Sequence, residues 1–225
     1  MNKNFYITTP IYYVNDIPHI GHAYTTILAD VLSRYQKQVG NDSFFLTGLD
    51  EHGQKVQDAA KHKGVDPIDH CNEMAKRFIS LWNKLHISNN DFIRTTEKRH
   101  KKVVEKILNI VNDAGDIYID EYEGLYSISE ERFITEKEAE SGQFRGIKKL
   151  KEKNYFFKMG KYQDALIEHI NTNPEFIQPE HRKNEILGFL QQPLNDLCIS
   201  RPKSRLNWGI DLPFDKDYVT YVWFD

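Results

Sequence analysis

Two histidines on either side of a glycine are the residues of this sequence whose types and spacing most directly suggest chemistry. His19, Gly21 and His22 follow a short apolar segment and stand where a helix is expected to begin. A helix N-terminus carries unpaired N–H groups and a partial positive charge, which both favour phosphate oxygens. Gly21 has no side chain to keep a nucleotide away, and the imidazoles can donate hydrogen bonds to phosphates without a metal. The pattern predicts a phosphate site suited to nucleotidyl transfer, where charge builds on the α-phosphate and the departing pyrophosphate.

The same residues have a plainer interpretation. A bare His-x-Gly-His match fits a pair of helix-capping or surface histidines equally well. The elements around the motif and the longer sequence context must therefore decide between the two.

The elements expected to position these groups alternate between strands and helices. Short β-branched and aromatic runs predict strands, and apolar residues at helical spacing predict helices between them. The expected strands are residues 5–9, 43–47 and 91–95, and the expected helices are residues 22–39, 54–63, 67–85 and 97–114. This alternation implies right-handed crossovers and an α/β fold with a doubly wound, Rossmann-like parallel sheet.

The residue pattern changes after Gly115. Residues 117–128 alternate and are rich in tyrosine, a charged run follows at 148–153, and helices are expected at 162–170 and 180–191. We therefore expect the first half of a nucleotide-binding catalytic domain in residues 1–115 and an inserted α+β module in 116–210. Residues 211–225 are expected to return the chain to the first sheet, through a hydrophobic strand at residues 218–225.

Composition narrows the class of protein. The chain has 225 residues, of which 40% are hydrophobic and 28% charged, and its formal net charge is -3, so it lacks the charge of a dedicated nucleic-acid binder. Cys71 and Cys198 lie far apart and match no metal-ligand spacing, which is typical of a reduced protein without disulfides or structural zinc. No signal region or stretch of about 20 apolar residues is present, so we predict a cytoplasmic protein.

The context of the histidine motif resembles a known family. The run from Thr8 to His22 (TTPIYYVNDIPHIGH) resembles the signature of methionyl-tRNA synthetases, which are class I aminoacyl-tRNA synthetases. Three further stretches are similar to that family in the same order: residues 48–53 (GLDEHG), residues 197–201 (LCISR) with 207–209 (NWG), and residues 221–225 (YVWFD). The resemblance covers essentially the whole chain.

The resemblance implies ATP-dependent activation of L-methionine to methionyl-adenylate, with Mg²⁺ accompanying ATP, and transfer of the methionyl group to tRNA(Met). The residues that it assigns to ATP are Tyr12, Asn15, His19, Gly21 and His22, of which the last three face the triphosphate as catalytic residues. Those that it places around methionine are Ile11, Tyr13, Asp50 and Trp223.

Physical chemistry agrees with the methionine assignment. Asp50 is expected at a strand end where doubly wound sheets bind ligands, and its carboxylate can pair with a substrate ammonium, although it could also cap a loop. Tyr13 and Trp223 can line a thioether, although strand aromatics also pack in cores. Glu51 and His52 invite acid–base roles that amino-acid activation does not need, so we expect them to be structural or to contact the tRNA end.

The sequence departs from the family pattern in two places. Many members hold zinc with two cysteine pairs in the inserted module, but Ser127 and Glu130 stand where the first pair would be, and residues 142–146 offer no second pair. We therefore expect no zinc. The family's Lys-Met-Ser-Lys-Ser loop has no counterpart, since the similar-looking residues 158–161 lie inside the insertion. The parts that complete the methionine and adenine pockets and read the anticodon are also expected to lie outside this sequence.

Three interpretations therefore remain open. The chain is a methionyl-tRNA synthetase fragment, weakly active or inactive alone, or half of a split enzyme that a second polypeptide completes. Alternatively, it is a non-catalytic fragment that keeps part of an ATP- or tRNA-binding surface. A small nucleotidyltransferase with the same histidine motif is disfavoured by the insertion and by the segment around Asp50.

Overall fold

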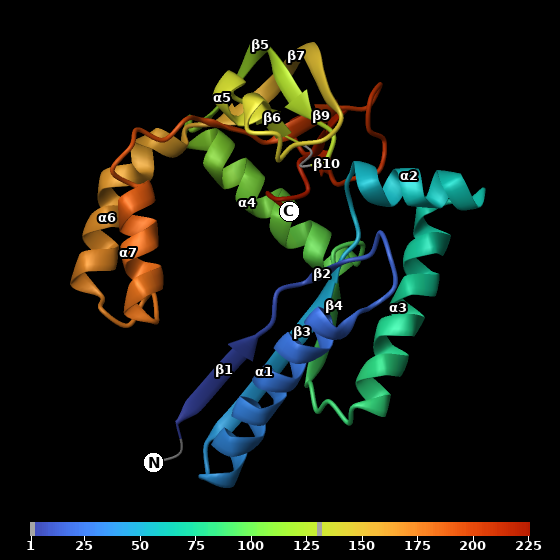
Figure 1. Ribbon diagram of the computed structural model, residues 1–225, viewed down its shortest axis with the longest axis vertical. Helices are drawn as coiled ribbons and strands as arrows, with labels where there is room; N and C mark the ends of the chain where they lie inside the picture. The colour runs from blue at the N-terminus through green and yellow to red at the C-terminus, as the bar shows by residue number, and fades with distance from the viewer. Residues whose placement is uncertain (1–2, 130–131) are drawn as a thin grey trace. The chain divides into compact units, whose positions relative to one another are not determined.

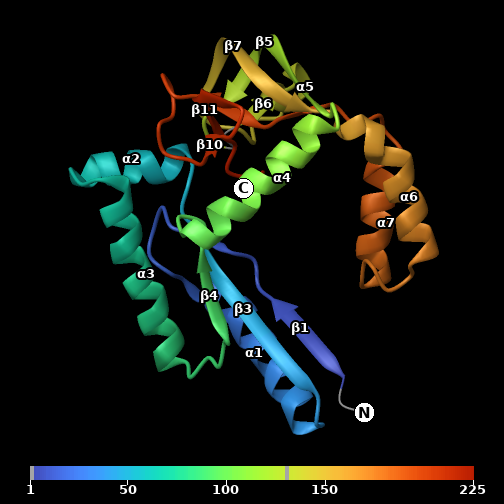
Figure 2. The ribbon, with the colours of Figure 1, turned by 180° about the vertical axis from the view of Figure 1, so that it is seen from behind.

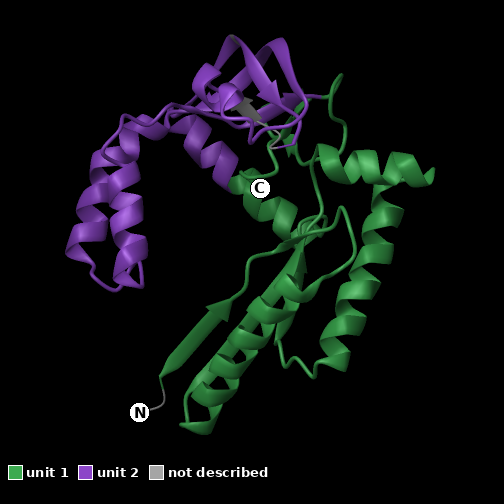
Figure 3. Ribbon diagram, in the orientation of Figure 1, with its two compact units in different colours: residues 1–106, 203–225 green, residues 107–202 purple. Residues whose placement is uncertain are grey.

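The computed structural model describes residues 3–129 and 132–225. These residues form two compact units, shown in different colours in Figure 3: residues 1–106 with 203–225, and residues 107–202. The assignment of residues 1–115, 116–210 and 211–225 to functional domains stays a prediction.

The first unit is built on a parallel sheet. Its strands are β1 (Asn4–Thr8), β2 (Tyr12–Tyr13), β3 (Asp42–Asp50) and β4 (Asp91–Arg94). The longest strand, β3, lies in the middle, with β1 and β2 following one another along one side and β4 along the other (Figure 1). Gly48 permits the close approach of β4, because a Cβ on this residue would lie 2.1 Å from the carbonyl oxygen of Ile93. The predicted parallel α/β sheet is confirmed.

Helices connect these strands at nearly the predicted positions. They are α1 (Ile20–Gln38), α2 (Gln54–Lys63), α3 (Pro67–Lys84) and α4 (Lys98–Asp113), of which α4 runs into the second unit. Gly64 ends α2 in a left-handed conformation, and Pro67 begins α3 at a position that needs no N–H donor. The α3 residues Met74, Phe78 and Trp82 form a buried core with Leu49 of β3.

Helix α1 packs on the sheet through small and polar residues. It lies in front of β3 in Figure 1 and behind it in Figure 2, so it covers one face. The side buried against the sheet carries Thr26, Ala29, Asp30 and Ser33. Apolar residues at helical spacing, which predicted the helix, lie exposed on its other side: Ile27, Leu28, Val31, Leu32, Tyr35 and Val39. The apolar periodicity identified the helix but not the side that packs on the sheet. The buried side is polar, and its polar groups are hydrogen-bonded: Asp30 by Arg34 and by the Ser88 amide and hydroxyl, and Ser33 by Ser43.

The last part of the chain differs from the prediction. A hydrophobic strand over residues 218–225 was expected to rejoin the parallel sheet, but this expectation is wrong. Strand β11 (Asp215–Thr220) pairs antiparallel with β10 (Asp211–Leu212). Residues 222–224 form a turn, in which the Phe224 amide donates to the Tyr221 carbonyl at 2.7 Å. Trp223 therefore lies in a turn.

The second unit, residues 107–202, has the α+β character predicted for the insertion. An antiparallel sheet in the order β6-β5-β7-β8 contains β5 (Ile117–Ser127), β6 (Arg132–Ile134), β7 (Ile147–Phe157) and β8 (Leu197–Cys198). Around it are α5 (Glu136–Glu140), the 3₁₀ helix η1 (Met159–Tyr162), α6 (Gln163–Thr172), α7 (Glu180–Phe189) and the short strand β9 (Ser200–Pro202). The charged run at 148–153 belongs to β7, where Lys149 and Lys151 pair with Glu123 and Glu121 of β5.

In the described part of the chain, no helix combines the length and the apolar character that crossing a bilayer requires.

Candidate active site at the start of helix α1

The predicted site residues of the first unit gather where the parallel strands end. Tyr13 and Asp50, the last residues of β2 and β3, are register partners. Arg94 ends β4 beside Leu49. In parallel sheets with helical crossovers this carboxyl edge is where ligands bind. Helix α1 begins seven residues after Tyr13, at Ile20.

Two imidazoles cap the start of α1. The Gly21 amide donates to Nδ1 of His19 at 3.1 Å, and the His19 amide donates to Nδ1 of His22 at 3.1 Å. The rings stack with centroids 3.8 Å apart. Since Nδ1 accepts in both cases, each neutral ring carries its hydrogen on Nε2. The capping interpretation is therefore correct, and it still leaves one N–H donor on each imidazole.

The environment of His22 keeps its imidazole neutral. Burial lowers the pKa of His22, and the neighbouring His19 lowers it further. Its ring lies 4.8 Å from that of Tyr12 and 5.3 Å from that of Phe78. Tyr12 is buried, and its hydroxyl lies 2.7 Å from that of Thr26 on α1. Tyr12 therefore fixes α1 and His22 relative to β2.

Gly21 has a local reason to be glycine. A Cβ on this residue would lie 2.9 Å from Cε1 of His19. The absence of a side chain on Gly21 therefore leaves room for the His19 ring that caps the helix, as well as for a nucleotide. Asn15, the remaining residue predicted to contact ATP, is exposed.

The four residues predicted around methionine are accessible to different degrees. Tyr13 and Asp50 are half-buried, and Ile11 is exposed. Trp223 is 80% exposed, so it is not packed in a core. The Lys55 ammonium lies over the Tyr13 ring, 5.9 Å from its centroid, which shows that this aromatic surface accepts a cation.

Glu51 follows Asp50 and is completely buried. Its carboxylate accepts a hydrogen bond from Nε of Arg94 at 2.7 Å and another from the Thr96 hydroxyl. The Thr95 hydroxyl lies 3.0 Å from its amide, and the Trp208 indole donates to its carbonyl. These bonds give Glu51 a structural role and fix the backbone just beyond Asp50.

Comparison with known proteins identifies the family of this chain. A family model described as class I tRNA synthetases (M) matches residues 5–144 and 139–225. The chain belongs to the class I methionyl-tRNA synthetases.

Relatives within this family are similar over the whole chain. A methionine–tRNA ligase of Fusobacterium nucleatum is 51% identical over 100% of this chain and 36% of its own length. One of Deinococcus radiodurans is 50% identical over 100% of this chain and 34% of its own length. A Mycobacterium tuberculosis methionyl-tRNA synthetase solved in complex with methionyl-adenylate is 39% identical, with a TM-score of 0.92, over 99% of this chain and 45% of that chain. The chain thus spans about a third of the length of these two ligases.

Several residues that support the candidate site were not predicted from the sequence. His70 of α3 is buried, and its Nε2 lies 2.8 Å from the Val14 carbonyl, which holds the segment between Tyr13 and His19. Thr26 and Trp208 have the supporting contacts described above. Polar groups that support a site show no periodicity, so nothing in the sequence indicated His70 or Thr26. Trp208 was indicated only by its place in a stretch that resembles the family.

The part of the inserted module that the structure describes does not present a zinc-ligand set. The Ser127 hydroxyl lies 3.0 Å from that of Ser129, and Glu130 lies outside the described residues. Within residues 3–129 and 132–225, no three histidine, cysteine or acidic side chains are grouped as metal ligands. Serine hydroxyls are not among the ligands zinc prefers. The absence of zinc stays a prediction.

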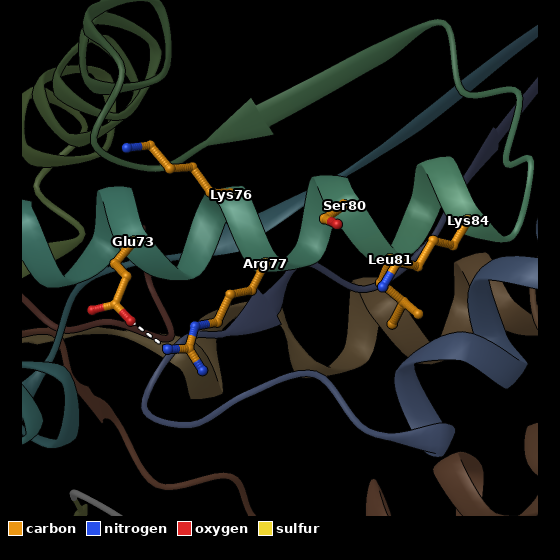
Figure 4. Close-up of a pocket in the computed structure, with 6 residues that line it drawn as sticks. All are labelled: Glu73, Lys76, Arg77, Ser80, Leu81 and Lys84. Carbon is orange, nitrogen blue, oxygen red and sulfur yellow. Dashed lines mark hydrogen bonds and ion pairs between the residues drawn. The ribbon is translucent and has the colours of Figure 1, made fainter.

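A hollow beside α3, drawn in Figure 4, is lined by residues other than those predicted for the site. Its lining comes from that helix alone: Glu73, Lys76, Arg77, Ser80, Leu81 and Lys84. Glu73 and Arg77 pair along the helix. None of the residues assigned to ATP or methionine borders it.

Proposed function

We propose that this chain supplies the ATP- and methionine-binding part of a methionyl-tRNA synthetase. In the reaction, ATP and L-methionine give methionyl-adenylate and pyrophosphate, and the methionyl group then passes to the 3′ end of tRNA(Met). The observation that carries the proposal is the double-histidine cap of α1, beside the strand ends that bear Tyr13 and Asp50.

His19 and His22 hold the triphosphate in this proposal. Their Nδ1 atoms cap the helix, so the Nε2–H groups are the donors that remain for phosphate oxygens. The partial positive charge of the helix N-terminus adds to this attraction. A carboxylate oxygen of methionine attacks the α-phosphorus, the bond to the bridging oxygen breaks, and pyrophosphate leaves with the electron pair. Mg²⁺ accompanies the nucleotide and offsets its charge.

The amino acid binds at the neighbouring strand ends. Asp50 pairs with the methionine ammonium, while Ile11, Tyr13 and Trp223 surround the side chain. The pairing of Tyr13 with Asp50 across the strand ends supports this assignment, because it brings the two residues close enough to contact one amino acid. The nucleophile is the ionised substrate carboxylate, so no general base is needed.

The synthetase also requires polypeptide beyond these 225 residues, in the same chain or in a second one. The relatives are about three times as long, and the outer side of α1 exposes a continuous apolar surface that includes Ile27, Val31 and Tyr35. Contiguous exposed apolar surface of this kind is typical of a binding interface. We infer that further synthetase residues cover it. The cytoplasmic location stays a prediction.

Methionine-dependent exchange of labelled pyrophosphate into ATP tests the function. We expect weak or no exchange by residues 1–225 alone, and strong exchange after addition of a polypeptide that corresponds to the remaining two thirds of a relative. His19→Ala and Asp50→Ala should abolish the restored exchange or raise its methionine requirement, without unfolding the protein. Unchanged kinetics in both variants would refute the site. Exchange with another acceptor would favour the nucleotidyltransferase, and ATP binding without exchange in any mixture would favour a binding fragment.

A further inference from the structure

A buried histidine and a buried aspartate join two distant segments of the first unit. Nδ1 of His52 lies 2.7 Å from Oδ2 of Asp225, 173 residues further along the chain. The two side chains are 1% and 0% exposed. A carboxylate can only accept, so Nδ1–H of His52 donates. Neither residue belongs to the proposed ATP or methionine contacts.

The His52 side of this pair is held rigidly. Glu51 is fixed by Arg94, as described above, and the Gly53 amide donates to the Trp208 carbonyl at 3.3 Å. The Trp208 ring lies 5.6 Å from that of His52. His52 is therefore a fixed point to which the other segment attaches.

The Asp225 side of this pair lies at the end of the turn that carries Trp223. Tyr221 and Val222 are buried and hold the start of the turn, but Trp223 is 80% exposed. Beyond Trp223, the end of the turn is held in the interior by the bond between His52 and Asp225 and by a hydrogen bond between the Asp225 backbone and His100 of α4. The turn that carries the indole is thus tied at both ends.

Each partner lies two residues from a residue of the proposed methionine site. His52 comes two residues after Asp50, and Asp225 comes two residues after Trp223. Two residues span at most about 7 Å of backbone, so the bond acts close to both side chains. It connects the carboxylate proposed for the substrate ammonium with the indole proposed for the thioether side chain.

Stability alone is a poor explanation for this arrangement. Among the described residues, Nε2 of His52 and Oδ1 of Asp225 are buried without a hydrogen-bond partner. Buried polar groups left in this way cost free energy, and a well-packed apolar pair would serve stability as well or better. A specific geometric requirement accounts better for a polar contact here.

We propose that His52 and Asp225 form a positioning pair that sets where Trp223 lies relative to Asp50. The pair thereby shapes the pocket for an amino acid with an unbranched apolar side chain. The identity of that amino acid rests on the function proposed above, whereas the positioning of the indole does not.

The test uses the 225-residue chain and two readouts. One is the indole N–H signals of Trp82, Trp208 and Trp223 in ¹⁵N-resolved NMR spectra, with Trp223 assigned through Trp223→Phe. The other is the Kd for L-methionine from calorimetry. The variants are His52→Ala, which removes the bond, and His52→Asn, whose side-chain N–H can replace Nδ1–H. Val56→Ala is the control, because Val56 is fully buried in the same unit and has no part in the pair.

We expect His52→Ala to move the Trp223 signal and to raise the methionine Kd by about 10-fold, equivalent to about 1.4 kcal/mol of lost contact. His52→Asn should restore much of both, and Val56→Ala should lower the unfolding midpoint without moving the Trp223 signal. If His52→Ala does not fold, Asp225→Asn weakens the same bond at nearly constant shape and should give a smaller shift.

An unmoved Trp223 signal in His52→Ala, or in Asp225→Asn where that variant serves, would overturn the proposal. So would His52→Asn behaving like His52→Ala, or Val56→Ala moving the signal equally. If methionine binds neither to the wild-type chain nor to this chain supplemented with the remaining part of a relative, the proposed function fails, but the Trp223 signal still decides the positioning.

Discussion

Replacing His19 separates its role as the N-cap of α1 from its proposed role as a phosphate donor. Asparagine can take over the cap, whereas alanine can take over neither role. The Gly21 amide donates to Nδ1 of His19 at 3.1 Å, and the ring stacks on His22 at 3.8 Å. Loss of an N-cap side chain costs about 0.5–2 kcal/mol, whereas asparagine is among the best capping residues. His19→Ala should therefore lower the free energy of unfolding by about 1 kcal/mol, and His19→Asn by much less.

Binding of ATP should respond differently. Hydrogen bonds to charged groups contribute about 1.5–3 kcal/mol, equivalent to roughly 10- to 150-fold in Kd. Because His19 is exposed and water competes for the phosphate, we expect the lower end of this range, about tenfold, in both variants. Urea unfolding followed by circular dichroism and calorimetric titration with Mg²⁺-ATP measure the two effects. If His19→Asn keeps the wild-type affinity, the cap is the whole role of His19 and the phosphate assignment is wrong.

Three further predictions concern the strand ends and the second imidazole. Asp50→Asn should raise the methionine Kd by about 10-fold or more in calorimetry, whereas Asp42→Asn, at the exposed start of the same strand, should leave it unchanged. Arg94→Ala removes a partner of the fully buried Glu51 carboxylate and should cost up to about 3 kcal/mol in urea unfolding, since Arg94 is partly exposed and water replaces some of the contact; no loss would contradict the importance of that contact. The pKa of His22 is lowered in the folded state, because its neutral imidazole fits the folded environment better than the charged one. The stability that the neutral imidazole contributes is therefore complete above 6.5, the pKa in the unfolded chain. It is lost as the pH falls from 6.5 through the pKa in the folded state. Unfolding midpoints should fall between pH 7 and pH 5 in the wild type and less in His22→Gln, and equal slopes would contradict this.

The parallel sheet was predictable because its signals are local. Helices α2 and α3 begin where the sequence predicted, since Pro67 and the glycines at positions 53 and 64 act on neighbouring backbone. The packing side of α1 was not predictable from its apolar residues. Its buried side includes Asp30, whose partners Arg34 and Ser88 lie on α1 itself and 58 residues away.

The candidate site was predictable to a similar extent. The sequence placed His19, Gly21 and His22 at a helix start, and the structure confirms that position. It did not show that both Nδ1 atoms are used in the cap, because that depends on ring orientation. The turn at Trp223 and the partner of His52 also escaped prediction, since both depend on contacts between segments more than 150 residues apart.

The imidazole nitrogens of His19 and His22 provide the most direct test of where ATP binds. Two-bond ¹H–¹⁵N NMR spectra report which nitrogen of each histidine carries hydrogen, and a titration with Mg²⁺-ATP reports which nitrogens meet phosphate. We predict Nε2–H tautomers for both residues in the free chain and ATP-dependent shifts of both Nε2 signals, with no shift for His62, which is exposed on α2. Saturable ATP binding that leaves both Nε2 signals unmoved, or hydrogen on Nδ1 of either ring, would contradict the account.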